Sequence, residues 1–228
     1  MQTLSYILKN LNMLKNRSVI LLSKIYVVGI GPGSEEYLTL KAKKIVDSAE
    51  VLVGSKRALE LFPESQGEKL ELNAKNMETE LKLAVSRAAS GKSVALLSTG
   101  DSGFSGILKP TLKLSGEVEV EVIPGISSIQ LCAAKLRIPW DEADLITLHG
   151  KGVSKELLEV LENGKPTIIL PNFKVKEIAR FLLDNGVDPG KKVAVCEKLS
   201  YPDERIVGMA LKDILDDNFG YMCVMVIF

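Results

Sequence analysis

The residues best suited to chemistry in this chain lie in a glycine-rich segment that follows an apolar run. The run is Ser93 to Leu97, and the segment after it contains Thr99-Gly100-Asp101-Ser102-Gly103-Phe104. An apolar run bounded by glycine predicts a buried strand, and ligands of open α/β sheets bind at the carboxyl ends of strands. Glycine lets a backbone approach a ligand closely, and the Asp101 carboxylate can accept hydrogen bonds from it. Alternatively, Asp101 or Ser102 caps a helix that begins here.

Two further loops follow apolar runs in the same way. They are Gly29-Ile30-Gly31-Pro32-Gly33 and Pro124-Gly125-Ile126-Ser127-Ser128. The first differs from the dinucleotide-binding fingerprint, because its third glycine comes one residue early behind a proline. Gly54-Ser55-Lys56-Arg57 also stands where that fingerprint needs an acid to bind the ribose. The sequence contains no G-x-x-x-x-G-K-[ST] phosphate loop either, so it argues against both NAD and ATP.

His149 is the only histidine of the chain. A single histidine near a strand end is more often a structural residue than a catalyst. Its Leu148-His149-Gly150-Lys151 context favours a contact with the substrate or a proton carrier near neutral pH, which makes His149 the candidate catalytic residue. The three cysteines show no metal-ligand spacing, so we expect no metal site.

Strand-like and helix-like segments alternate from Ile25 onward, which predicts βαβ units and a mostly parallel sheet. In the first part we expect strands at 25–30, 49–53, 94–97 and 118–123, and helices at 38–46, 58–62, 77–89 and 127–136. The segment 137–141 breaks the pattern and predicts a boundary between domains at 24–138 and 139–228. In the second part we expect strands at 145–148, 167–170, 192–196 and 221–228, a strand or hairpin at 201–207, and helices at 155–161, 175–183 and 209–215. The predicted fold class is α/β, with two consecutive α/β domains.

The composition is that of a soluble globular protein. Of the 228 residues, 46% are hydrophobic and 25% charged, and 29 Lys and Arg balance 29 Asp and Glu. This balance creates no overall field that would attract nucleic acid or an anionic membrane. The odd number of cysteines argues against a secreted disulfide framework and predicts a cytoplasmic protein. The segment 1–23 has no apolar run long enough for a signal or a membrane span, so we interpret it as an N-terminal extension, with Met13 as an alternative start.

The three loops together resemble the tetrapyrrole methylase family, whose members transfer a methyl group from S-adenosylmethionine. In that family a G-x-G-P-G loop, a G-D-x-x-F loop and a P-G-[IV]-[ST]-[SA] loop shape the cofactor site in a cleft between two α/β domains. The resemblance covers nearly all of 24–228 and is similar in detail to the branch that methylates C-5 of a cobalt-precorrin (corrin) ring in cobalamin biosynthesis. Val27 to Gly33, Ile138-Pro139-Trp140-Asp141 and the His149 element match that branch, whereas Ser102 replaces the proline that many members carry there.

The resemblance implies a set of site residues. The expected cofactor contacts are Pro32, Thr99, Gly100, Asp101, Phe104, Ser127 and Ser128, with Pro171 and Leu199 closing the cleft from the second domain. The expected contacts of the substrate carboxylates are Lys56, Arg57, His149 and Lys151. The base that removes the ring proton is not assigned.

Two classes of function remain open at this point. The first is a corrin-ring C-methyltransferase, or a sister enzyme that acts on another tetrapyrrole carbon, an rRNA or a protein. The second is a non-catalytic, cofactor-binding partner of a decarboxylating C-15 methyltransferase. The resemblance also implies a homodimer and a separate C-15 methyltransferase/decarboxylase subunit as partner.

Overall fold

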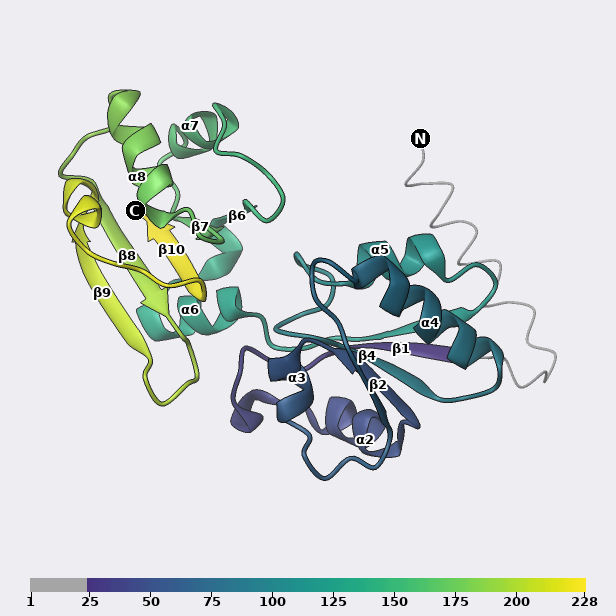
Figure 1. Ribbon diagram of the computed structural model, residues 1–228. Helices are drawn as coiled ribbons and strands as arrows, with labels where there is room; N and C mark the ends of the chain where they lie inside the picture. The colour runs from purple at the N-terminus through teal and green to yellow at the C-terminus, as the bar shows by residue number, and fades with distance from the viewer. Residues whose placement is uncertain (1–23) are drawn as a thin grey trace.

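The computed structural model describes residues 24–228, which form two α/β parts joined by a short connection (Figure 1). The expected N-terminal extension and the alternative start lie outside these residues. The first part holds one sheet covered by helices on both faces, and the second part holds another (Figure 1).

The first sheet is entirely parallel. Its strands are β1 (Lys24–Gly29), β2 (Val51–Gly54), β3 (Glu68–Glu71), β4 (Val94–Ser98) and β5 (Glu119–Ile123), in the spatial order β3-β2-β4-β1-β5. The helices are α2 (Leu40–Ser48), α3 (Lys56–Glu60), α4 (Met77–Ala89) and α5 (Leu108–Leu114). Helices α2 and α3 pack on one face of the sheet, and α4 and α5 on the other. Strands covered on both faces must be apolar throughout, which is why β1, β2 and β4 read as continuous apolar runs.

The second sheet is mixed. It contains β6 (Asp144–Thr147), β7 (Thr167–Leu170), β8 (Lys192–Glu197), β9 (Arg205–Ala210) and β10 (Cys223–Ile227), in the order β6-β7-β10-β8-β9. Strand β10 lies antiparallel to both β7 and β8. The helices are α6 (Ser128–Leu136), α7 (Glu156–Leu161) and α8 (Val175–Asp184). Helix α6 covers one face of this sheet, and α7 and α8 cover the other.

The predicted α/β class and the parallel first sheet are confirmed, but three elements differ from expectation. Strand β3 and helix α5 were not predicted, because β3 is a short charged edge strand and α5 carries a proline. The helix expected at 209–215 is wrong: β9 continues to Ala210, where it pairs with Lys192, and only 211–215 form a 3-10 turn.

Helix α6 follows the first sheet in sequence but packs in the core of the second. Its buried residues Ile129 and Cys132 belong to the same apolar cluster as Ile168 and Val224 of the second sheet. The division at residue 138 stays a prediction, and the packing of α6 favours a division nearer residue 124.

The packing of α6 also brings two cysteines together. Cys132 of α6 and Cys196 of β8 are free thiols, both fully buried, with their sulfur atoms 3.4 Å apart. The hydrogen bond between the two sulfur atoms contributes most to raising the pKa of Cys132 far above that of an ordinary thiol, and burial raises it further. This pair therefore acts as a small apolar contact within the core.

Candidate functional site

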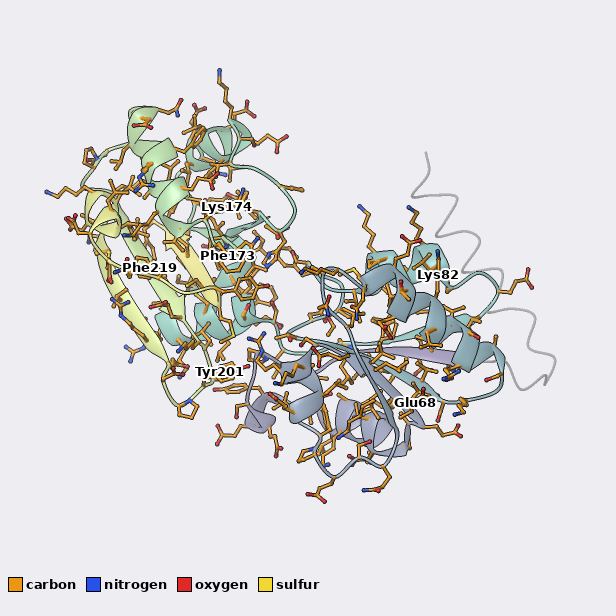
Figure 2. All side chains as sticks on the ribbon, viewed as in Figure 1. Glu68, Lys82, Phe173, Lys174, Tyr201 and Phe219 are labelled. Carbon is orange, nitrogen blue, oxygen red and sulfur yellow. The ribbon has the colours of Figure 1, made fainter. Side chains whose placement is uncertain are left out.

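A cleft of about 460 Å³ lies between the two sheets, at the carboxyl ends of β1, β4 and β5. The first domain contributes its strand-end loops, and the second contributes the loops before β10 and after β8. Tyr201 marks the point where the second domain reaches the first (Figure 2).

Three glycines from the three loops meet beneath this cleft. A Cβ atom on Gly125 would lie 2.4 Å from the carbonyl oxygen of Gly100 and 2.7 Å from the Cα of Gly29. Neither distance leaves room for a side chain, so these loops touch backbone to backbone. Gly31 and Gly100 also exchange hydrogen bonds of 3.3 and 2.7 Å, and both have the positive φ that glycine tolerates. The three loops, which the resemblance places around one cofactor site, therefore form one unit in the structure.

Asp101 joins two of these loops through its carboxylate. One oxygen accepts the N–H of Gly103 at 2.8 Å, and the other accepts the N–H of Gly125 at 3.1 Å. The side chain is half-buried and lines the cleft, so its remaining lone pairs are available to a ligand bound there. The alternative in which Asp101 or Ser102 caps a helix is wrong, because α5 begins only at Leu108 and has no side-chain cap.

Helix α6 starts at the third loop. The Ser127 hydroxyl accepts the N–H of Ile129 at 3.2 Å, and Gln130 accepts the N–H of Ser127 at 2.8 Å. This reciprocal capping fixes the position of Ser127 and Ser128 on the cleft wall. Phe104, from the second loop, reaches across and packs against the core of the second domain.

The second domain contacts the first loop through a strained turn that follows β8. Lys198 and Ser200 have φ values of 48° and 71°, which side chains rarely adopt. The Ser200 hydroxyl accepts the N–H of Ser34 at 3.1 Å, and the Tyr201 ring lies so close to Gly33 that a Cβ there would be 2.1 Å from it. The turn therefore holds the second domain against the first loop.

A second loop of this domain, just before β10, lines the cleft with Tyr221, Met222 and Cys223. Glu197 anchors it, because its buried carboxylate accepts the N–H of Gly220 at 2.7 Å and pairs with Arg205 at 2.8 Å. Glu197 is thus turned away from the cleft. Burial raises the pKa of the Cys223 thiol to about 12, so this cysteine is a neutral wall residue at physiological pH.

Two polar groups line the cleft from different domains. Arg57, on α3, extends its guanidinium to the sulfur of Met222, and His149 lies beyond β6 on the opposite domain. Burial lowers the pKa of His149, which keeps its imidazole neutral near pH 7.

The structure brings most of the sequence-predicted residues to the cleft. Lining it are Pro32, Thr99, Gly100, Asp101, Phe104, Ser127, Ser128, Leu199, Arg57 and His149. Three others do not line it: Lys56 and Lys151 are exposed elsewhere, and Pro171 is buried behind Leu170.

Sequence reasoning missed Tyr201, Tyr221 and Met222, which also line the cleft, as does Lys198 beside the predicted Leu199. The only local signal was the position of Tyr201 and Tyr221 beside apolar runs. Among residues 24–228 there is no cluster of three or more His, Cys, Asp or Glu side chains that could hold a metal ion. No helix in the same range has the length and hydropathy of a membrane span.

The family model for tetrapyrrole (corrin/porphyrin) methylases matches residues 24–215. A probable cobalt-precorrin-7 C(5)-methyltransferase of Methanocaldococcus jannaschii is 50% identical over 205 residues, which cover 89% of this chain and 96% of that protein. A cobalt-precorrin-4 C(11)-methyltransferase of the same organism is 30% identical over 209 residues, covering 85% and 81% of the two chains.

Solved structures share the fold. The uroporphyrin-III C-methyltransferase of Thermus thermophilus, in complex with S-adenosylhomocysteine, superposes with a TM-score of 0.76 at 25% identity and covers 90% of this chain and 96% of its own. The predicted resemblance and the fold of two α/β domains are thereby confirmed. The chain belongs to the tetrapyrrole (corrin/porphyrin) methylase family.

Proposed function

We propose that this protein transfers a methyl group from S-adenosylmethionine to C-5 of a cobalt-precorrin ring in cobalamin biosynthesis. The observation that carries the proposal is the meeting of the three loops in one cleft, with Gly29, Gly100 and Gly125 in backbone contact and the second domain closing over them. The expectation of a methyltransferase that uses this donor is confirmed by the family and by the relatives described above.

The cleft fits such a donor. Its volume of about 460 Å³ lies within the range of about 300–1,000 Å³ typical of small-molecule sites. The glycine junction brings the backbone close to the cleft, and the Asp101 carboxylate complements a cation. The donor supplies a methyl group already activated on a sulfonium sulfur, so the protein needs no covalent nucleophile of its own.

What remains for the protein is positioning. Alignment of two reactants can contribute about 7–11 kcal/mol to lowering a barrier. The rigid glycine junction would fix the donor, while Phe104, Leu199 and Tyr201 would keep water from the cleft. Proton loss from the ring carbon completes the reaction.

The substrate side of the proposal rests on Arg57 and His149. A corrin precursor carries acetate and propionate carboxylates, and a guanidinium binds carboxylates well. Both residues line the cleft, from opposite domains. Lys56 and Lys151 lie outside it, so we place them at most at the periphery of a large ring.

The choice of C-5 over another ring carbon follows from the two relatives of one organism. The chain is 50% identical to the C(5) enzyme but 30% identical to the C(11) enzyme. This difference favours C-5 chemistry. The retention of all three loops argues against the non-catalytic alternative.

The decisive experiment is anaerobic incubation with cobalt-precorrin-7 and S-adenosylmethionine whose methyl carbon is ¹³C-labelled. We expect the mass of the ring to rise by a single methyl group and one new ¹³C resonance to appear at C-5. Donor binding without any methyl gain would support the non-catalytic reading, and a label on another carbon would support a sister enzyme.

The remaining parts of the proposal concern the setting. We expect a homodimer in the cytoplasm, working with a separate C-15 methyltransferase/decarboxylase subunit. Three free thiols support a reducing compartment. Sedimentation analysis and co-purification with that subunit would test the assembly.

A further inference from the structure

A line of hydroxyl groups connects the two domains at the edge of the cleft and ends at the only histidine. The Ser105 hydroxyl lies 2.6 Å from that of Thr147, so the two side chains bridge the first and second domains. The Thr147 oxygen lies 3.3 Å from Nδ1 of His149 and accepts the backbone N–H of the same residue, also at 3.3 Å. Ser105 and His149 both line the cleft.

With Ser105 donating to Thr147, the direction of the bond between Thr147 and His149 follows from counting lone pairs. A hydroxyl oxygen accepts two hydrogen bonds and donates one. The Thr147 oxygen accepts from Ser105 and from the His149 backbone, so both of its lone pairs are used. Its own proton is then free for the remaining neighbour, Nδ1 of His149. A neutral imidazole that accepts at Nδ1 carries its proton on Nε2.

The backbone conformation at Ser105 indicates that its side chain makes a contact that offsets the strain. Its φ of 61° lies in the left-handed region, which favours glycine, and Gly103 and Gly106 stand close by in the same loop. Serine at such a position persists when the surroundings define it. Here the hydroxyl makes the contact with Thr147 that a glycine could not make.

We propose that Thr147 and Ser105 are positioning residues that hold neutral His149 with its proton on Nε2, so that this imidazole donates a hydrogen bond to a carboxylate of the substrate and does not act as the base. The part that concerns the substrate rests on the proposed function. The part that concerns the tautomer does not. The bridge also ties this donor to the loop of Asp101, so the substrate-binding group is set in place when the two domains close.

The charged surroundings agree with a neutral donor. The charged side chains that line the cleft with His149 are Asp101, Arg57 and Lys198, and Lys151 lies two residues further along the same turn. Burial is what lowers the pKa of His149, and no charge partner contributes to that shift. The imidazole is therefore uncharged when the substrate arrives, and it recognises a carboxylate through the direction of its Nε2–H bond.

The single histidine makes the test direct. In a preparation labelled with ¹⁵N-histidine and carrying no polyhistidine tag, one pair of imidazole nitrogen signals reports the tautomer without assignment. At about pH 8, where the ring is neutral, we expect an Nε2–H signal pattern for the wild-type protein. An Nδ1–H pattern would overturn the proposal.

Three variants separate the roles. Thr147→Val keeps the branched shape and removes the hydroxyl, and we expect a mixture of both tautomers. Thr147→Ser restores the hydroxyl and should restore the wild-type pattern. Ser105→Ala should give a smaller change in the same direction, because one lone pair of the Thr147 oxygen is then free to accept a hydrogen bond from an Nδ1–H of His149. Wild-type signals in both Thr147→Val and Ser105→Ala would overturn the proposal, and circular dichroism of each variant checks that it is folded.

Kinetics test the consequence for the substrate. In Thr147→Val we expect KM for the ring substrate to rise about two- to tenfold, because only part of the imidazole population then carries its proton on Nε2, with the Kd for S-adenosylmethionine and the kcat unchanged. A fall in kcat at constant KM would instead assign His149 as the base and overturn the donor role. If the wild-type protein methylates no ring at all, the proposed function fails, while the ¹⁵N signals still decide the tautomer.

Discussion

The two walls of the cleft are built in different ways. The wall from the first domain rests on a backbone junction: three parallel strands end at one edge, and their loops meet through glycines that leave no space for a side chain. The wall from the second domain is mainly side chains, which project from turns around the antiparallel strand β10.

This difference indicates a division of labour. A backbone wall has a fixed shape and presents the same polar groups whatever the neighbouring side chains are, which suits an invariant ligand such as a methyl donor. A side-chain wall can change residue by residue without disturbing the fold, which suits the choice among ring substrates. Substitutions in the first wall should therefore affect folding and donor binding, whereas those in the second should affect closure and the substrate.

The largest effect is expected where the backbone wall is tightest. In Gly125→Ala the new methyl would lie 2.4 Å from the Gly100 carbonyl oxygen, so the loops must separate. We expect the free energy of unfolding to fall by about 3 kcal/mol or more. Urea denaturation measures it, with Gly152→Ala as the matched control because no atom lies within 4 Å of its Cβ position. Equal stability of the two variants would show that the junction is not rigid.

Asp101 tests whether the backbone wall also binds the donor. Asp101→Ala removes the acceptor of two backbone N–H groups, and we expect a loss of about 1–2 kcal/mol in stability. Calorimetry should show at least a tenfold, or about 1.4 kcal/mol, loss of affinity for S-adenosylmethionine. Asp101→Asn, which keeps one acceptor oxygen, should recover part of the stability and part of the affinity. Unchanged affinity in Asp101→Ala would remove this residue from the donor site.

The contact between Gly33 and Tyr201 tests how the walls close on each other. In Gly33→Ala the methyl would lie 2.1 Å from the Tyr201 ring, which must move out of the cleft. We expect donor affinity to fall several-fold, by about 1 kcal/mol. Adding Tyr201→Ala should make the Gly33→Ala change nearly silent, because the clash is gone. Additive effects in this double-mutant cycle would show that the contact does not control closure.

The smallest effect is a pH dependence that belongs to the side-chain wall alone. Burial lowers the pKa of His149 below its ordinary value of 6.5, so below that pH the unfolded chain binds a proton that the folded protein does not. The free energy of unfolding should therefore fall as the pH drops through 6.5. His149→Gln should abolish this part of the profile. The bond to Lys135 helps to lower the pKa of Glu204, so the effect of Glu204 on stability falls at a pH below 4.5 and does not overlap with that of His149. An unchanged profile in His149→Gln would contradict the assignment.

The contrast between the walls also explains what could be predicted from sequence. Glycine-rich turns after apolar runs are local signals, so Gly100, Asp101 and Ser127 were placed correctly at the strand ends. The second wall depends on β10 entering the sheet between β7 and β8 in the antiparallel direction. No local pattern encodes that pairing, and Tyr221 and Met222 were missed for that reason.

The error at Lys56 arose because its side chain points in a different direction from that of its neighbour on the helix. Lys56 starts α3 one residue before Arg57, and a change of one position on a helix turns a side chain through about 100°. Neighbouring basic residues therefore divide between the cleft and the solvent.

Helix α6 gives the molecule a joint whose position matters. The helix moves with the second sheet because it is packed in its core, yet its first residues form part of the floor of the cleft. Any rotation of one domain against the other must therefore bend the chain between Ile123 and Ser127, the same stretch that touches Gly29 and Gly100. Binding of a ligand on the floor of the cleft and the angle between the two domains are therefore coupled through the same five residues.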